Sequence, residues 1–171
     1  MPAGSMSDRM QSPRRTLVAG IGYTYLRDHS VGPVLAQRLA QRRWPPGVEV
    51  DDFSFGAIDA VHRLRSSGYD RAVFYGAAVR GEAPGSIRRY RWVGGQDAHT
   101  VQEMVAEAAQ AVISLEHTLI VAGHFGALPD PTWVFEIEPE DQGYGEGFTP
   151  AVEEAVGQLE RLLRAEVAAD A

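Results

Sequence analysis

Residues 16–42, TLVAGIGYTYLRDHSVGPVLAQRLAQR, constrain the fold more than any other part of the chain. Residues 17–19 form a short apolar run typical of a strand buried on both faces. Gly20 and Gly22 follow, and their missing side chains let the chain turn and let other backbone or a ligand come close. Ser30 is a candidate helix N-cap. After it, four apolar residues share one helical face: Val31, Val34, Leu35 and Leu39. Strand, glycine turn, polar loop and helix form the opening unit of an open α/β sheet.

Asp28 and His29 lie in the polar loop between this strand and this helix. In open α/β sheets, ligands bind in the crevice outside the carboxyl ends of the strands. Loops placed there by a rigid scaffold carry a large share of functional side chains. We therefore expect any chemistry of this chain to begin at Asp28 and His29.

The rest of the chain alternates between strand and helix patterns. Strands are predicted over residues 48–53, 71–75, 86–93 and 133–137. Helices are predicted over residues 57–65, 100–111 and 114–125, and from Pro150 onward, with Ser114 and Thr149 as N-caps of the last two. A strand over residues 118–122 is an alternative, because this run is apolar and β-branched.

This order of elements, βαβαββ(αα)βα, predicts an α/β fold. We expect a three-layer α/β/α sandwich whose central sheet is mostly parallel but mixed, with one antiparallel strand. Residues 1–15 are rich in Ser, Pro, Gly and Arg without periodicity and are predicted to be a disordered leader. Residues 16–168 are predicted to form a single domain.

The composition of the chain excludes several classes of protein. A formal charge of −7 argues against nucleic acid as the main partner. The basic run at residues 88–91 is interpreted as the solvated face of a strand. Cysteine is absent, which excludes disulfides, thiolate metal ligands and a cysteine nucleophile. No apolar run reaches the ~18 residues of a membrane span, and the start of the chain lacks a signal-peptide core. The cytoplasm is the expected location.

Common ligand and nucleophile motifs are incomplete or missing. Gly20-Ile21-Gly22 lacks the third glycine of a dinucleotide fingerprint, and no phosphate-binding loop ending in Gly-Lys-Ser/Thr is present. An acidic residue near the end of the second strand, Asp51 or Asp52, keeps a nucleotide-binding interpretation open. No Gly-x-Ser-x-Gly elbow exists, which argues against a serine hydrolase.

Histidines and carboxylates offer one candidate metal site. His62, His117 and His124 fall within predicted helices and are interpreted as ordinary helical histidines. Asp28 and His29 supply two of the three or four ligands that a catalytic metal needs, and His99 is a candidate third ligand. In the alternative interpretation, Asp28 only caps the loop that follows it.

Six stretches have an order and spacing that are specific when they are taken together. They are residues 17–22 followed by Asp28 and Val31-Gly32, Gly68-Tyr69-Asp70, residues 81–86, residues 125–129, residues 135–141 and residues 147–152. This series resembles the hydrogenase maturation endopeptidases, nickel-sensing proteases that trim the C-terminus of the large subunit of nickel-iron hydrogenases. The resemblance runs from Leu17 to about Arg164 and implies the phosphorylase/hydrolase-like version of the α/β/α sandwich.

The resemblance also shows where this chain departs from the family. The family recognises nickel in its substrate through a glutamate, an aspartate and a histidine. The glutamate directly follows the aspartate matched by Asp28, so His29 takes its place here. Gly76 stands at the position of the aspartate. The histidine position falls near Ala111, or on His99 in another alignment. Glycine and alanine have no side-chain ligand, and an imidazole in place of a carboxylate softens the site.

Three functions remain open at this point. The first is a maturation protease with an atypical site built from Asp28, His29 and His99, which has no metal of its own and senses nickel in the substrate. The second is a catalytically inactive relative that serves as a binding or chaperone module. Both would have a hydrogenase large subunit or a related metalloprotein precursor as the partner. The third is a small-molecule or nucleotide binder.

Partner contacts are assigned to two places. Gly20, Gly22 and Gly76 lie at the strand ends, and Tyr144 lies in a glycine-rich loop at residues 143–147 that could become ordered on contact with a partner. The acidic residues around this loop are interpreted as a solvated strand end and loop, or alternatively as a docking patch for a basic surface: Glu136, Glu138, Glu140, Asp141 and Glu146.

Overall fold

A central five-stranded sheet organises the chain in the computed structural model, which describes residues 12–95, 98–108 and 113–169. The strands are β1 (Thr16–Gly20), β2 (Val48–Asp52), β3 (Arg71–Ala77), β4 (Ile87–Arg91) and β5 (Thr132–Ile137). They lie side by side in the order β2-β1-β3-β5-β4. All neighbours are parallel except β4 and β5, which pair antiparallel. The predicted mixed sheet with one antiparallel strand is confirmed.

The helices also follow the predicted order. They are the 3-10 helix η1 (Arg27–Ser30), α1 (Val31–Ala40), α2 (Ala57–Ser67), α3 (Ala98–Ala108), α4 (Leu115–His124) and α5 (Pro150–Ala168). The alternative strand over residues 118–122 is wrong, because this segment lies within α4. Most of the predicted leader, residues 1–11, lies outside the described residues. None of the helices in the described ranges is long and apolar enough to cross a membrane.

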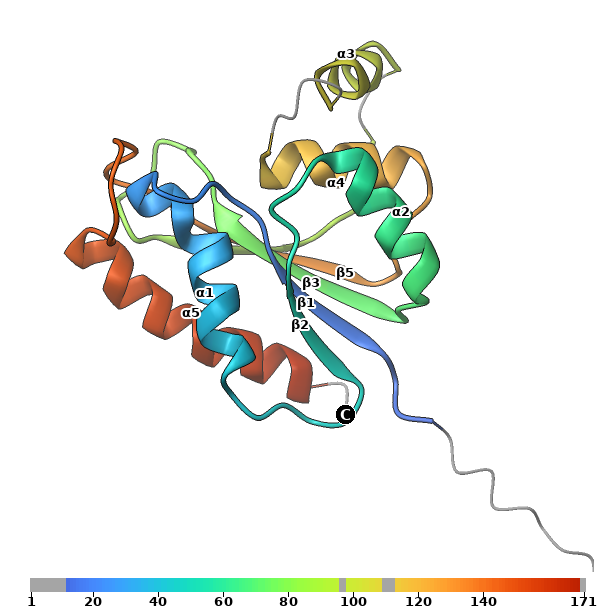
Figure 1. Cartoon of the computed structure of the whole chain (residues 1–171), viewed down its shortest axis with the longest axis horizontal. Coiled ribbons are helices and arrows are strands. Elements are labelled where there is room, and N and C mark those ends of the chain that lie inside the picture. The colour runs from blue at the N-terminus through green and yellow to red at the C-terminus, as the bar shows by residue number, and fades with distance from the viewer. Residues whose placement is uncertain (1–11, 96–97, 109–112, 170–171) are drawn as a thin grey trace, which may run out of the picture.

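Two apolar clusters give the fold its three layers (Figure 1). One face of the sheet, with Leu17 and Phe74, packs against α2 and α4. The opposite face, with Val18 and Tyr75, packs against α1 and α5. Because side chains alternate along a strand, each residue of β3 and β5 belongs to one of these two faces. The α/β/α sandwich is therefore confirmed.

Two glycines, Gly20 and Gly32, let the end of β1 pack closely against the first turn of α1. A Cβ atom on Gly20 would lie 2.1 Å from the carbonyl oxygen of Gly32, in the first turn of α1. Only glycine at position 20 therefore allows the end of β1 to pack this closely against α1. Asp51 pairs with Arg63, and Asp52 accepts a hydrogen bond from the backbone N–H of Ser54. Both acidic candidates for a nucleotide contact are thus engaged by other residues of the chain.

The helix caps were predicted at the right positions, although only one of the three hydroxyls acts as predicted. Ser114 caps α4, since its Oγ accepts a hydrogen bond from the backbone N–H of His117 at 3.1 Å. Ser30 and Thr149 stand at the N-cap positions of α1 and α5, but neither makes a side-chain cap hydrogen bond. Ser30 instead accepts from the N–H of Leu26, and Thr149 donates to Asp28.

Replacing Ser114 with alanine should destabilise the protein by about 1 kcal/mol, because the first turn of α4 would lose a hydrogen-bond acceptor. Urea unfolding of the wild-type and variant proteins would measure the difference. Ser66→Ala is the matched control, since the hydroxyl of Ser66 is exposed and bonds within its own helix. A loss for Ser114→Ala no larger than for the control would contradict the role of the cap.

The basic run in β4 makes surface ion pairs. Its arginine side chains are about half exposed and pair with carboxylates of three other segments: Arg88 with Glu82, Arg89 with Glu166, and Arg91 with Asp130. This arrangement agrees with the interpretation of residues 88–91 as a solvated strand face.

Candidate functional site

The carboxyl ends of β1, β3 and β5 form the floor of the crevice in which chemistry was expected. Ile21 continues β1, and its backbone N–H donates to the carbonyl oxygen of Tyr75 in β3 at 3.0 Å. In the sheet, Gly76 of β3 stands opposite Glu136 of β5. Gly76 and Glu136 lie on the same face as Phe74 and Val134, the face covered by α4. The ends of these strands thus lie next to the first turn of α4, where Leu115 is close to Gly76. We refer to this region as the crevice.

Gly76 leaves no room for a side chain at the centre of this floor. A Cβ atom there would lie 2.5 Å from the carbonyl oxygen of Ile21 and 3.6 Å from the Cβ of Leu115 in α4. The position that the resemblance gives to a metal-binding aspartate is therefore closed by neighbouring backbone. Gly76 is buried, as are Gly20 and Gly22, so these three proposed partner contacts lie beneath the surface.

A carboxylate, Glu136, lies opposite Gly76 on the neighbouring strand β5. Glu136 is 2 % exposed. Its two oxygens accept hydrogen bonds from Nε and Nη2 of Arg80, at 3.0 and 2.8 Å, and from the hydroxyl of Tyr90 at 2.7 Å. Burial alone would raise the pKa of Glu136, but the bonds from Arg80 and Tyr90 outweigh it and hold the pKa below its ordinary value. Glu136 is therefore a carboxylate anion whose charge is balanced within the protein.

Glu138 fixes the loop that carries Arg80. It is 6 % exposed, and its carboxylate accepts the backbone N–H groups of Arg80 at 2.7 Å and Gly81 at 3.3 Å. The interpretation of the acidic stretch as solvated is thus wrong for Glu136 and Glu138, since buried charges need partners inside the fold. For the same reason, these two carboxylates are not available as part of a docking patch.

A tyrosine of the loop after β1, Tyr23, contacts the segment before α4. It follows the end of β1, and its hydroxyl oxygen accepts a hydrogen bond from the backbone N–H of Ile113, just before α4, at 3.0 Å. The phenol thereby connects the β1 loop to the start of α4. Its ring is partly exposed.

Asp28 joins the loop after β1 to the loop after β5. It is fully buried. Its Oδ2 accepts from the backbone N–H groups of Glu140 and Asp141 and from the hydroxyl of Thr149, and its Oδ1 accepts from the N–H of Thr149, all at 2.9 Å. Burial alone would raise the pKa of Asp28, but the donors of Asp141, Thr149 and Glu140 lower it. Asp28 thus caps a loop, but this is the loop between β5 and α5 and not the loop that follows Asp28, as the alternative interpretation expected.

The same two loops meet again beside Asp28. Tyr25 and Arg27 have left-handed backbone conformations, with φ of 60° and 42°. The carbonyl oxygen of Tyr25 accepts from the N–H of Gly145, and the N–H of Arg27 donates to the carbonyl oxygen of Gly145, so Leu26 and Gly145 form a bridge. This backbone geometry is unfavourable for non-glycine residues and is held by the opposite loop. Tyr25 and Tyr144, next to the bridge, remain exposed by 54 % and 84 %.

The predicted metal ligands do not form a metal site in the described part of the chain. All oxygens of Asp28 face loop donors, His29 is partly buried next to it, and Gly76 has no side chain. The side chain of His99, in the first turn of α3, and the whole of Ala111 lie outside the described residues. Within the described ranges, no group of three His, Asp or Glu side chains could hold a metal ion. Among the described side chains, Asp28 and His29 by themselves do not fit a bound nickel ion.

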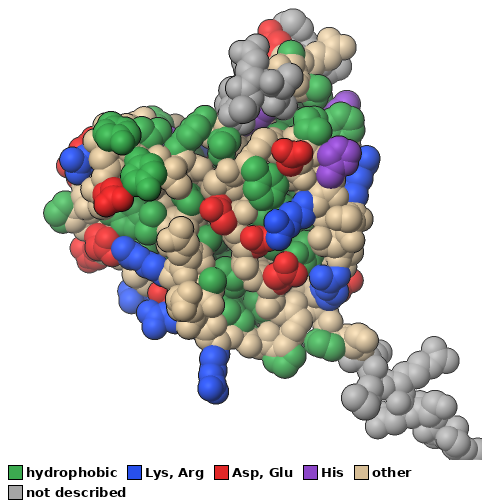
Figure 2. All heavy atoms as spheres, in the orientation of Figure 1, with side chains coloured by type: hydrophobic (Ala, Val, Ile, Leu, Met, Phe, Trp, Pro, Cys, Tyr) green, Lys and Arg blue, Asp and Glu red, His purple; other side chains and the backbone are tan. Residues whose placement is uncertain are grey.

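The loops after β1, β3 and β5 carry exposed apolar side chains. Figure 2 shows hydrophobic side chains at the surface on the side where the loops after β1, β3 and β5 lie in Figure 1. The large exposed hydrophobic residues of these loops are Tyr23, Tyr25, Val79 and Tyr144. We call these four residues the rim cluster.

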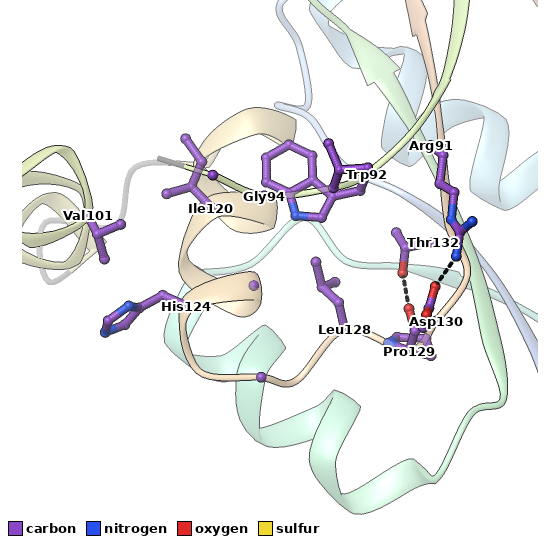
Figure 3. A pocket seen from close by; sticks show the side chains of 14 residues that line it. Arg91, Trp92, Gly94, Val101, Ile120, His124, Leu128, Pro129, Asp130 and Thr132 are labelled. Atoms are coloured by element: carbon purple, nitrogen blue, oxygen red, sulfur yellow. Dashed lines mark hydrogen bonds and ion pairs between the residues drawn. The ribbon is translucent and has the colours of Figure 1, made fainter. Parts of the chain in front are cut away.

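A cavity of about 460 Å³ lies at the other end of the sheet. Figure 3 shows Trp92 and Leu128 beside Ile120 and His124 of α4 and Val101 of α3, with the exposed Arg91–Asp130 ion pair at one side. Because it lies where β4 ends and β5 begins, this cavity is separate from the carboxyl-edge crevice.

Sequence reasoning missed Arg80 and Tyr90 as members of the site. One signal was present: Glu136 interrupts an apolar strand, and a carboxylate in a buried strand requires a positive partner. Its partners lie 56 and 46 residues away, and no local pattern identifies them.

Solved structures place this fold among known proteins. The chain is similar to a hydrogenase 2 maturation peptidase from a Thaumarchaeota archaeon, with 21 % identity over 88 % of this chain and 95 % of that one and a TM-score of 0.62. The hydrogenase maturating endopeptidase HybD from E. coli is 24 % identical over 89 % of this chain and 93 % of that one, with a TM-score of 0.59. The endopeptidase HycI from Escherichia coli is 19 % identical over 88 % of this chain and 90 % of that one, with a TM-score of 0.63.

Comparisons of sequence give no further assignment. No protein-family model and no curated protein matches the chain. The similarity to these solved structures extends over 88 to 89 % of the chain, at identities of 19 to 24 %. The chain has the fold of the hydrogenase maturation proteases.

Proposed function

We propose that this chain acts in the maturation of a nickel-iron hydrogenase, as a divergent relative of the maturation proteases that binds the large-subunit precursor. The observation that carries this proposal is the crevice at the carboxyl edge. Its strands, loops and neighbouring helix are retained, while Gly76 and His29 stand where the resemblance expects carboxylates that recognise nickel.

The chemistry of the crevice favours binding over nickel-guided cleavage. Asp28 is engaged by four donors, and Glu136 is engaged by Arg80 and Tyr90. A carboxylate that already accepts this many hydrogen bonds would have to give them up to ligate a metal. We therefore expect the affinity for the precursor to be the same with and without nickel.

The rim cluster offers a surface for the precursor. Exposed apolar patches on a protein surface commonly mark interaction sites. Tyrosine is enriched among the residues that dominate binding energy, because it buries a large ring and keeps a polar end. Tyr25 and Tyr144 are held next to each other by the Leu26–Gly145 bridge, so they need little ordering on contact.

The experiment that tests this function mixes the purified protein with the unprocessed large subunit of a hydrogenase from the same organism, in nickel-loaded and nickel-free forms. Co-elution with both forms, and an intact C-terminus by mass spectrometry, are the expected results. Loss of a C-terminal peptide that His29→Ala prevents would establish a protease with an atypical site instead. Absence of both binding and cleavage would overturn the proposal.

Replacing both Tyr25 and Tyr144 with alanine should weaken binding of the precursor by about 10- to 100-fold, since two exposed anchors would be lost. Titration calorimetry with the precursor would measure the change. Val93→Ala is the control, because Val93 is 87 % exposed but lines the cavity at the other end of the sheet. Equal affinities for the double variant and the wild type would rule out the rim cluster as the contact surface.

A further inference from the structure

Arg80 has hydrogen-bonding capacity that the fold does not use. Its Nε and Nη2 are bonded to Glu136. Within the described residues, the charged contact of Nη1 is Oε2 of Glu116 at 3.9 Å, which is beyond hydrogen-bond distance. The side chain of Arg80 is 30 % exposed, so it is in part accessible to solvent.

The guanidinium group is also fixed in place. Glu136 holds it in a bidentate pair, Tyr90 orients Glu136, and Glu138 anchors the backbone of Arg80 and Gly81. The bonds to Glu136 raise the pKa of Arg80 above its ordinary value, although burial opposes this. A planar donor group that is held in this way loses little freedom when it binds a second carboxylate.

We propose that Arg80 is the anchor of a carboxylate-binding site, which takes a carboxylate group of the bound polypeptide at Nη1. Arg80 is hydrogen-bonded to Glu136, and Glu136 stands opposite Gly76 in the sheet. The carboxylate of the bound polypeptide would therefore lie at the crevice floor. The identification of that polypeptide as the precursor rests on the proposed function, while the site itself does not.

Glu116 would compete with an incoming carboxylate for Nη1 of Arg80. It lies in the first turn of α4, is about half exposed, and has no hydrogen bond to Arg80. An incoming carboxylate would be repelled by Glu116 and attracted by Arg80. Removing the charge of Glu116 should therefore strengthen binding, whereas removing Arg80 should abolish it.

The first experiment titrates the protein with N-acetylglycine and, separately, with the uncharged N-acetylglycinamide, and follows the Arg80 side-chain signals by NMR. N-acetylglycine should shift these signals in a saturable way, and the amide should not. Glu116→Gln should lower the dissociation constant about two- to tenfold. No shift, or equal shifts with both compounds, would overturn the proposal.

Variants at Arg80 need a partner substitution, because Arg80→Gln alone leaves the buried Glu136 unpaired. The double variant Arg80→Gln/Glu136→Gln removes both charges. It should lose the response to N-acetylglycine in the backbone amides of residues 76–80, and Arg91→Gln, at the far end of the sheet, should keep it. A retained response in the double variant would also overturn the proposal.

The second experiment compares the precursor with a form whose C-terminal carboxylate is amidated. Weaker binding of the amidated form would assign the carboxylate to the chain terminus, and unchanged binding that is still lost in the double variant would assign it to an Asp or Glu side chain. If N-acetylglycine binds and the precursor does not, the carboxylate site stands and the proposed function fails. If the precursor binds with equal affinity to the wild type and the double variant, the function stands and the carboxylate site fails.

Discussion

Replacing Asp28 with asparagine is expected to lower the free energy of unfolding by about 3 kcal/mol at pH 7, because hydrogen bonds to a charged group contribute about 1.5–3 kcal/mol and a buried donor left without its acceptor costs about 1–3 kcal/mol. Asparagine keeps one acceptor oxygen and places an NH₂ group against backbone N–H donors. The four hydrogen bonds of Asp28, to Glu140, Asp141 and Thr149, cannot all be made by that side chain. Chemical unfolding followed by circular dichroism would measure the loss.

The same carboxylate should make stability depend on pH. The folded pKa of Asp28 lies below the ordinary value of 3.8, so its contribution is fully present well above pH 4 and is lost as the pH falls through the folded pKa. Between pH 5 and pH 3, stability should therefore fall more steeply in the wild type than in Asp28→Asn. Asp130→Asn is the control, because Asp130 is 83 % exposed in its ion pair. Parallel pH profiles for wild type and Asp28→Asn would contradict the role given to Asp28.

Local patterns predicted the elements of this fold because each element carries its own signal. The apolar run before Gly20, the helical periodicity after Ser30 and the N-cap at Ser114 all concern residues a few positions apart. The resemblance of the sequence to the maturation endopeptidases likewise predicted the fold that the solved structures share.

The interior of the site depends on pairs that are distant in the sequence. Asp28 was placed correctly in the loop after the first strand, but its donors lie 112 to 121 residues away. These distant donors decide whether the carboxylate is free to bind a ligand or is buried as a cap. No pattern within the loop identifies them. Thr149 illustrates the same limit, since its position marks the start of α5 but its hydroxyl bonds to Asp28.

Gly76→Asp, which introduces the residue expected at this position in the resembled family, should destabilise the fold by about 2–4 kcal/mol. Two separate effects contribute. The added Cβ would lie 2.5 Å from the carbonyl oxygen of Ile21, and forcing atoms into a packed core costs about 1–3 kcal/mol. The added charge would stand opposite Glu136 on the same face of the sheet, and like charges directly opposite each other are destabilising.

Gly76→Ala separates these effects, because it adds the Cβ without the charge. The difference between the Asp and Ala variants should shrink when both are made in a Glu136→Gln background, and this double-mutant cycle measures the repulsion directly. An Asp variant as stable as the wild type, or one that binds nickel, would show that the backbone of Ile21 can move aside. The crevice would then be a metal site that lacks one ligand. The expected result instead means that glycine at position 76 of β3 goes together with the pair between Glu136 of β5 and Arg80 of the loop after β3. With Arg80 as its fixed cation, the crevice floor has no place for a second charge on β3.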